Sequence, residues 1–260
     1  MRRDFLVGIG LLASVAAGGG SAVAADIPVR PVPPAAAPAT CCAVPDWVGF
    51  YVGIHGGGGG ARTSTEQQTF FTSNFIPSTF FAVPDTNPSG GVFGFQWGHN
   101  WQWGPVVGGL EIDFSGADIK GSNTFFILPA FPFDTFTRDQ KIEELASARG
   151  RLGYLIFPNW LLYGTAGIGW GHFRLHTTDA FVRDGLFALT DSTSFANEFG
   201  WVVGAGLEFK FWNNWMVRGE WLHYDFGRVT HNDTAFPFPF DNVNFRTTVD
   251  VGRAAISYKF

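Results

Sequence analysis

The chain has 260 residues and a net charge of −5, and only 15% of its residues are charged, although it contains 29 phenylalanines, 10 tryptophans and 34 glycines. Because a soluble surface normally carries roughly a quarter to a third of charged positions, this composition argues against a water-covered exterior. The acidic balance and the lack of a basic stripe in any segment exclude nucleic acid as a partner.

Residues 1–25 have the pattern of a secretory signal peptide. Two arginines precede an apolar run that extends from Phe5 to Ala17, and small residues follow it. This run is shorter than the roughly 20 apolar residues that a membrane-spanning helix requires. We expect cleavage after Ala24 or Ala25 and export from the cytoplasm.

Residues 26–46 are rich in proline and alanine, and we expect them to form an extended periplasmic tether. Cys41 and Cys42 lie within this segment. Adjacent cysteines make a poor disulfide with each other, because the required Cα separation and dihedral angle strain the peptide between them. Two thiols alone cannot build a metal site either, so the pair predicts no specific chemistry.

From Trp47 onwards, apolar residues alternate with polar or small residues with a period of two. No stretch shows sustained helical periodicity or 18 consecutive apolar residues, so helical membrane spans are excluded. The alternating segments are long enough for tilted strands that cross a bilayer. The eight predicted strands are 47–61, 91–103, 106–119, 142–157, 160–175, 196–211, 215–228 and 245–260.

The connections between these segments are alternately short and long. The short ones are 104–105, 158–159 and 212–214, and the long ones are 62–90, 120–141, 176–195 and 229–244. Tight turns at one end of a meander and long loops at the other are typical of outer-membrane barrels, in which the short turns face the periplasm. Closing the first strand against the last removes both sheet edges. The predicted fold is therefore all-β, an eight-stranded antiparallel up-and-down transmembrane β-barrel over residues 47–260.

Residue parity separates a bulky apolar face from a face of glycine and polar residues in each strand. In the second strand, Phe93, Phe95 and Trp97 oppose Gly94, Gln96, Gly98 and Asn100. A soluble lipocalin-like barrel would turn the bulky face inward, but an eight-stranded barrel has little interior volume. We therefore expect the aromatic face to contact outer-membrane lipid and lipopolysaccharide.

The opposite face places charged residues in the narrow lumen. Buried charges are costly unless they are paired, and acids and bases are nearly balanced on this face. The predicted ladder of lumen ion pairs consists of Glu111, Asp113, Arg149, Arg151, Glu208, Arg218, Glu220, Arg253 and Lys259. Scattered surface charges are the alternative, but they would not explain why these residues share their parity with glycine.

Aromatic residues gather beside the short turns and at the end of the chain. Girdles of aromatic residues mark the two membrane interfaces of outer-membrane barrels. The predicted periplasmic rim consists of Trp103, Trp160, Trp212, Trp215, Tyr258 and Phe260. A last strand with a terminal aromatic residue also resembles the signal by which the barrel assembly machinery recognises its substrates, so this machinery is an expected partner.

Eight segments carry a resemblance to a known family: "ADIPV", "WVGFYVGIHGGGG", "GVFGFQWGHNWQ", "GLEIDF", "ARGRLGY", "WLLYGTAGIGW", "VRGEWLHYDFG" and "ISYKF". They resemble the small eight-stranded outer-membrane proteins of Gram-negative bacteria, in particular the porin-like surface-antigen family, of which some members are labelled hemin-binding. The resemblance extends from the signal to the terminus. It implies the fold and a location in the outer membrane, but no particular activity, because the family is functionally diverse.

Few residues suggest chemistry. His172 and His176 share a strand face, but metal centres usually take three or four protein ligands, so we expect no metal and no cofactor. His55 is expected in the lumen and His223 on a barrel face. No serine and histidine pair predicts a nucleophile with its base, and the glycines at 56–60 indicate a bent strand end or hinge, not a phosphate cradle. We therefore expect that the chain is not an enzyme.

Phenylalanine is concentrated in the long loops, in "TFFTSNFIPSTFFAVP", "TFFILPAFPFDTF" and "TAFPFPFDN". Exposed aromatic patches usually mark a contact, so these loops are expected to form a lid, to lie in the outer leaflet or to bind an extracellular partner. The predicted role is structural or surface-interacting, with a lumen filled by side chains. Two alternatives are a narrow porin for small solutes and a surface receptor for an apolar ligand such as hemin, with His176 and His231 as candidate ligands.

Overall fold

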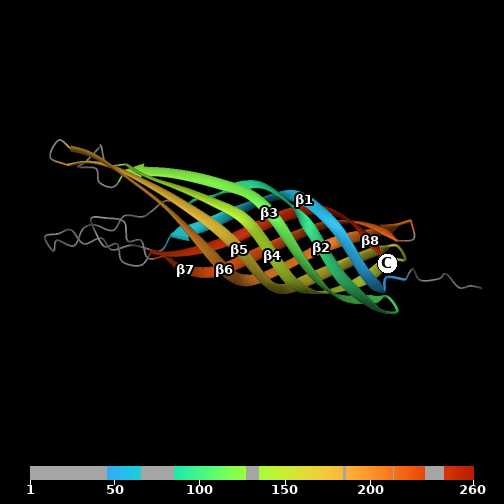
Figure 1. Ribbon diagram of the computed structural model, residues 1–260. Helices are drawn as coiled ribbons and strands as arrows, with labels where there is room; N and C mark the ends of the chain where they lie inside the picture. The colour runs from blue at the N-terminus through green and yellow to red at the C-terminus, as the bar shows by residue number, and fades with distance from the viewer. Residues whose placement is uncertain (1–45, 66–84, 127–134, 184–185, 213, 232–242) are drawn as a thin grey trace, which may run out of the picture. The chain divides into compact units, whose positions relative to one another are not determined.

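The computed structural model describes residues 46–65, 85–126, 135–183, 186–212, 214–231 and 243–260. They form one closed barrel of eight antiparallel strands in chain order (Figure 1). The strands are β1 (Gly49–Thr65), β2 (Ser89–Trp103), β3 (Val106–Phe126), β4 (Thr135–Phe157), β5 (Trp160–Arg183), β6 (Leu186–Phe211), β7 (Trp215–His231) and β8 (Val243–Lys259). The predicted all-β, eight-stranded fold is confirmed. No helix among the described residues is long and apolar enough to cross a membrane.

Some predictions fall outside the described residues. They are the signal peptide, the tether up to residue 45 with Cys41 and Cys42, and the loop segments 66–84, 127–134 and 232–242.

Pairing between the first and last strands closes the barrel. The register of β1 with β8 extends from Tyr51 opposite Lys259 to Thr65 opposite Phe245. The N–H of Phe260 donates a further hydrogen bond to the carbonyl oxygen of Phe50 at 2.9 Å. The first and last strands therefore have no open edge in this part of the barrel.

Three short connections lie at one end of the barrel, which we call the turn end. They join β2 to β3 through Gly104 and Pro105, β4 to β5 through Pro158 and Asn159, and β6 to β7 after Trp212. Gly104 has a φ of 59°, a left-handed conformation that glycine adopts without steric cost. The opposite end is called the loop end.

Several strands are longer at the loop end than predicted. Pairing of β3 with β4 continues to Phe126 opposite Thr135, and pairing of β5 with β6 continues to Arg183 opposite Leu186. Most of the predicted loops 120–141 and 176–195 are therefore strand. The prediction ended these strands at the length of a bilayer crossing, but threonine and aromatic residues favour strand beyond the membrane as well.

The glycines at 56–60 lie inside β1 and pair with both β2 and β8, so the predicted strand end or hinge is wrong. A Cβ atom on Gly57 would lie 2.1 Å from the carbonyl oxygen of Gly252 and 2.7 Å from the Cα of Arg253. Glycine at this position lets the two backbones approach and leaves space for the Arg253 side chain. The first strand also begins later than predicted, at Gly49, so Trp47 lies before it.

Exposure alternates along the strands as the parity predicts. Phe93, Phe95 and Trp97 are all more than half exposed, whereas Gln96 and Asn100 are buried inside the barrel. The large apolar side chains thus lie on the outside, and small or polar ones point into the lumen.

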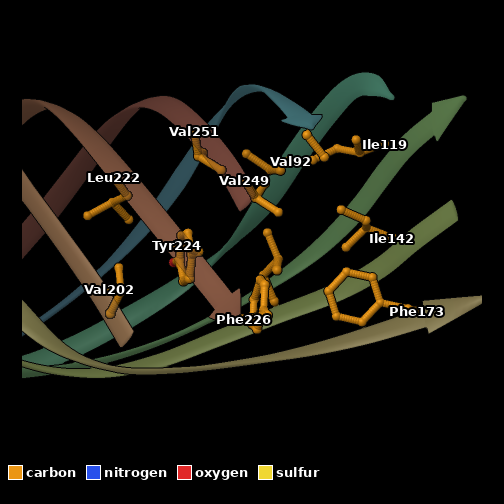
Figure 2. Packing of buried hydrophobic residues seen from close by; sticks show 12 residues of the cluster. Val92, Ile119, Ile142, Phe173, Val202, Leu222, Tyr224, Phe226, Val249 and Val251 are labelled. Atoms are coloured by element: carbon orange, nitrogen blue, oxygen red, sulfur yellow. The ribbon is translucent and has the colours of Figure 1, made fainter. Parts of the chain in front are cut away.

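The lumen contains two separate apolar layers. The loop-side layer consists of Ala61, Val92, Ile119, Ile142, Leu145, Phe173, Val202, Leu222, Tyr224, Phe226, Val249 and Val251. Figure 2 shows these side chains converging inside the barrel from strands on opposite walls. The turn-side layer consists of Trp47, Tyr51, Val107, Leu155, Leu161, Tyr163 and Met216.

Candidate functional site

Charged side chains occupy the lumen between the two apolar layers. They come in pairs separated by one residue, such as Glu111 and Asp113 on β3 and Arg149 and Arg151 on β4. Since side chains alternate across a strand, residues two positions apart point to the same face, here the lumen. Glu208 on β6, Arg218 and Glu220 on β7 and Arg253 on β8 complete the set.

Glu111 lies at the centre of this network. Its Oε1 atom accepts a hydrogen bond from Arg149 Nη2 at 2.5 Å, and its Oε2 atom accepts one from Arg218 Nη1 at 2.5 Å. The hydroxyl of Tyr51 donates to the same Oε2 atom at 2.6 Å. One carboxylate is therefore held by two guanidinium groups and a phenol, which compensates for its removal from water.

Asp113 and Glu220 are each shared by Arg149 and Arg253. Asp113 lies 2.9 Å from both guanidinium groups, while Glu220 lies 3.1 Å from Arg149 and 2.8 Å from Arg253. The hydroxyl of Ser147 also donates to Asp113, and that of Tyr163 donates to Glu220 at 3.0 Å. The contacts thus cross the lumen from β3 and β4 to β7 and β8.

Arg151 and Glu208 form the remaining ion pair. Arg151 Nη2 donates a hydrogen bond to Glu208, and Nη1 lies 3.8 Å from Glu111, which joins this pair to the rest of the network. The Arg151 guanidinium also lies 4.1 Å from the centroid of the Tyr163 ring. A cation over an aromatic face in a desolvated site is attracted to it.

The eight residues form one connected network with no net formal charge. It consists of four carboxylates and four guanidinium groups: Glu111, Asp113, Glu208, Glu220, Arg149, Arg151, Arg218 and Arg253. Each of these residues is at most 6% exposed. Because each charge is paired with an opposite charge, the network needs no counterions.

Lys259 belongs to a different contact from the predicted ladder. Its ammonium group lies at the turn end, where it donates to Asp46 Oδ2 at 2.9 Å and to the carbonyl oxygen of Val48 at 2.7 Å. Lys210 Nζ donates to the carbonyl oxygen of Asp46 at 2.6 Å. Lys259 is the next-to-last residue of the chain, so its inward side chain reaches the mouth of the lumen and not its middle. It is the one member of the predicted ladder that the structure separates from the other eight.

These lysines hold the chain where it enters the barrel at Trp47. The Trp47 side chain is fully buried in the turn-side layer, with its backbone N–H donating to Gln102 Oε1 at 2.9 Å and its indole N–H donating to the Pro158 carbonyl oxygen at 3.3 Å. The pKa of the Asp46 carboxyl is lowered, mainly by the hydrogen bond from Lys259. We call the contacts of Asp46, Trp47 and the two lysines the entry clasp.

A pair of serine and histidine that was not predicted from the sequence lies beside the network. His55 Nε2 is 2.7 Å from Ser115 Oγ, and His55 Nδ1 is 2.5 Å from Gln96 Oε1. The pair was missed because β1 and β3 are brought together only through β2, across a long sequence separation. The group that orients His55 is an amide, not a carboxylate, and both His55 and Ser115 are buried.

His172, His176 and His223 lie on the outward face of their strands. His172 Nδ1 lies 2.8 Å from Asn197 Oδ1, and His176 Nδ1 lies 3.0 Å from Thr193 Oγ1. His223 Nδ1 lies 2.9 Å from Asp250. Within the described ranges, no group of three or more histidine, cysteine or acidic residues is arranged to hold a metal ion.

The predicted rim residues all lie at the turn end. Trp103, Trp212 and Phe260 are 64%, 83% and 71% exposed, so their rings cover the outside of the barrel. Trp215 and Tyr258 form an edge-on ring contact at 5.2 Å, and Tyr258 forms another with Phe260 at 5.4 Å. Trp160 packs against Phe209 at 4.6 Å.

The two apolar layers of the lumen were not predicted from the sequence. Tyr51 and Tyr163 share the inward parity of the charged residues, and this signal could have placed them in the lumen. Trp47 gives no such signal, because it lies before the first strand and its position depends on the entry clasp.

Comparison with known proteins agrees with this architecture. The family model described as "Outer membrane protein beta-barrel domain" matches residues 32–256. The chain belongs to this outer-membrane β-barrel family. The 31 kDa outer-membrane immunogenic protein of Brucella melitensis is 32% identical over 253 residues, which cover 96% of this chain and 98% of the relative.

Two further similarities cover different shares of this outer-membrane barrel. A 22 kDa outer membrane protein of Rhizobium leguminosarum is 32% identical over 133 residues, 50% of this chain and 49% of the relative. The crystal structure of the outer membrane protein OprG from Pseudomonas aeruginosa is 12% identical, covers 84% of this chain and 98% of that chain, and has a TM-score of 0.46.

Membership in the family explains the exposed aromatic surface. An outer-membrane barrel is surrounded by lipid, so the outward rings of Phe93, Phe95 and Trp97 contact hydrocarbon and not water. The predicted location in the outer membrane and the resemblance to small Gram-negative outer-membrane barrels are confirmed.

Proposed function

We propose that this outer-membrane barrel is a sealed structural and surface-interaction protein that passes no solutes. The observation that carries the proposal is the lumen network, in which four arginines and four carboxylates neutralise one another. A porin lumen is polar and filled with water, and its charges face the permeating solute. Here the charged groups face each other.

The apolar layers on both sides of the network support the same conclusion. A solute would have to displace Trp47 and its neighbours at the turn end and Phe173, Tyr224 and Phe226 toward the loop end. Phe173 and Phe226 pack edge to face with centroids 5.1 Å apart. Moving through these layers would break both apolar packing and buried ion pairs, which makes passage unfavourable.

The proposal includes no enzymatic activity. The pair of His55 and Ser115 has hydrogen-bonding geometry, but both side chains are buried within the filled lumen. Gln96 takes the place at which a carboxylate would stabilise a protonated histidine. A substrate therefore has neither a path to Ser115 nor the charge arrangement that activates a serine.

We also propose outer-membrane lipid, lipopolysaccharide and the barrel assembly machinery as partners. The exposed aromatic face supports the contact with lipid. The last strand supports recognition by the assembly machinery, because the apolar residues Ile256, Tyr258 and Phe260 alternate with the buried inward residues Ser257 and Lys259.

Conductance in planar lipid bilayers tests the sealed lumen. The purified, refolded protein is expected to give no stable current steps, whereas a water-filled porin in the same bilayer gives them. Circular dichroism of the same preparation in liposomes must show β-structure, so that silence cannot be due to failed insertion. Stable channels in the wild-type protein would contradict the proposal.

A further inference from the structure

The two edges of β6 are paired to different extents. One edge pairs with β5 along its whole length, from Leu186 to Phe209, whereas the other pairs with β7 only from Trp201 to Phe211. Among the residues that the structure describes, no strand pairs with this second edge between Leu186 and Gly200. Figure 1 shows the β5–β6 hairpin extending well beyond the body of the barrel. We call this part of β6 the free edge.

A bulge in β7 explains why the pairing stops. The last β6–β7 pair is Trp201 with Asp225, and the register of β7 with β8 shifts between Asp225 and Arg228. Gly227 has a φ of 69° inside this bulge, and its N–H donates to Asp225 Oδ1 at 2.8 Å. Arg246 on β8 donates to Asp225 Oδ2 at 2.6 Å. Bulges of this kind bend a strand and end its pairing, and they are features that proteins retain for a purpose.

The backbone groups that face the free edge can be identified from the register. The N–H of Lys210 donates to the Asn159 carbonyl oxygen at 2.9 Å, so even-numbered residues of β6 bond to the β5 side. The β5–β6 register has no shift, and donors alternate along an antiparallel strand. The N–H and C=O groups of the odd-numbered residues therefore point to the free edge. These residues are Asp191, Thr193, Phe195, Asn197 and Phe199.

The free edge has few of the devices that normally prevent strand pairing. Proteins protect exposed edges with lysine, proline or inward charges; Leu186–Gly200 contains no lysine, arginine or proline, and Glu198 is its one charge with inward parity. Its outward side chains are apolar at Leu189, Phe195 and Phe199, which are 61%, 56% and 72% exposed. An open row of backbone donors flanked by exposed aromatic rings is suited to receive another strand.

We propose that Asp191–Phe199 binds an extended, basic peptide segment of a partner protein by strand addition. The acidic residues Asp191 and Glu198 are the charged residues of this part of β6, so a basic strand complements it. The Asp191 carboxylate lies 3.3 Å from His176 on β5, and its side chain stays 62% exposed. A second copy of the chain would bring its own acidic edge, which disfavours self-pairing. The inference deepens the surface-interaction part of the proposed function and does not depend on the sealed lumen.

Peptide binding in detergent micelles tests the proposal, with fluorescence anisotropy as the measurement. The probe is a short synthetic peptide that alternates lysine with valine and threonine. One control peptide carries N-methyl groups on the backbone amides that would bond to β6, and another has glutamate in place of lysine. We expect saturable binding of the first peptide and at least about tenfold weaker binding of both controls, because each loses hydrogen bonds or charge complementarity.

Matched protein variants separate the backbone contact from side-chain effects. Thr193→Pro removes a donor of the free edge without removing a bond to β5, and Thr193→Val removes only the hydroxyl group. We expect about tenfold weaker peptide binding in the first variant and a change of less than about twofold in the second.

Equal binding of the N-methylated peptide to the wild-type protein would overturn the proposal, even if Thr193→Pro did not fold. Sedimentation that showed a wild-type dimer, broken by Thr193→Pro, would overturn it in favour of a second copy as the occupant. Conductance measurements test separately whether the lumen is sealed, so the two proposals can fail independently.

Discussion

At the scale of single residues, Glu111 contributes most to holding the lumen charges together. It bonds to Arg149, Arg218 and Tyr51, and it is only 3% exposed. Removing one partner from a buried ion pair is costly because the opposite charge stays buried without compensation. The same change in an exposed pair has little effect, because water replaces the lost partner.

Glu111→Ala is therefore expected to lower the free energy of unfolding by about 3–5 kcal/mol. The matched control is Glu143→Ala, which removes the carboxylate from the more exposed pairs with Lys141 and Arg174 and is expected to cost less than about 1 kcal/mol. Urea unfolding of the protein in lipid vesicles measures both values. Equal losses in the two variants would show that the lumen charges are in contact with water.

The entry clasp predicts a dependence on pH. The pKa of Asp46 is lowered by the hydrogen bond from Lys259, so the carboxylate stabilises the folded state above its unfolded pKa and loses this effect as the pH falls through its folded pKa. The wild-type protein is expected to be more stable than Asp46→Asn at neutral pH, and the difference is expected to shrink below about pH 4. Unfolding curves of both proteins across this range check it. A constant difference down to acidic pH would mean that the carboxylate does not stabilise the clasp.

At the scale of strands, two neighbouring glycines of β1 have different surroundings, and the sequence alone does not show this difference. Gly57 faces inward and touches the backbone of β8. Gly58 faces outward, and a Cβ atom added to it would lie 3.5 Å from its nearest neighbour, the carbonyl oxygen of Gly90. Overpacking a filled interior typically costs about 1–3 kcal/mol. The two adjacent positions thus form a matched pair for substitution.

Gly57→Val is expected to lower the thermal unfolding midpoint, because its side chain would displace Arg253 from Asp113 and Glu220. Gly58→Val is expected to leave the midpoint within a few degrees of the wild-type value, because valine on this face contacts lipid. Circular dichroism during heating in micelles gives both midpoints. A larger effect at Gly58 than at Gly57 would contradict the inward assignment of Gly57.

Strand order and facing could be predicted from the sequence, but strand ends could not. Alternation in segments such as 91–103 follows directly from burial on one face of a strand. It therefore predicted correctly that Phe93 faces outward and Gln96 faces inward. Strand length at the loop end depends on pairing between neighbouring strands outside the membrane. Single-strand alternation does not report this pairing, and the loops predicted at 120–141 and 176–195 were therefore mostly wrong.

At the scale of the whole molecule, the lumen is filled in three levels: an apolar layer, the ion-pair network and a second apolar layer. Parity alone predicted correctly that all nine ladder residues face inward, since charge and glycine share one face. It could not show that Lys259 lies beside Asp46, nor that Trp47 closes the turn end, because both depend on where the chain enters the closed ring. These contacts are set by barrel closure and not by local sequence.

The enclosure of the network predicts how its ion pairs respond to salt. Raising the ionic strength from about 0.1 M to 1 M shortens the Debye length from about 10 Å to 3 Å, which weakens pairs in contact with water but hardly affects buried ones. The coupling free energy of Arg151 with Glu208, from a double-mutant cycle with alanine at each position, is therefore expected to be unchanged by salt. The more exposed pair of Arg174 with Glu143 is the internal control, and its coupling is expected to fall toward zero. If the two couplings fell in parallel, salt would be reaching the lumen, and the barrel would be a narrow pore instead of a sealed one.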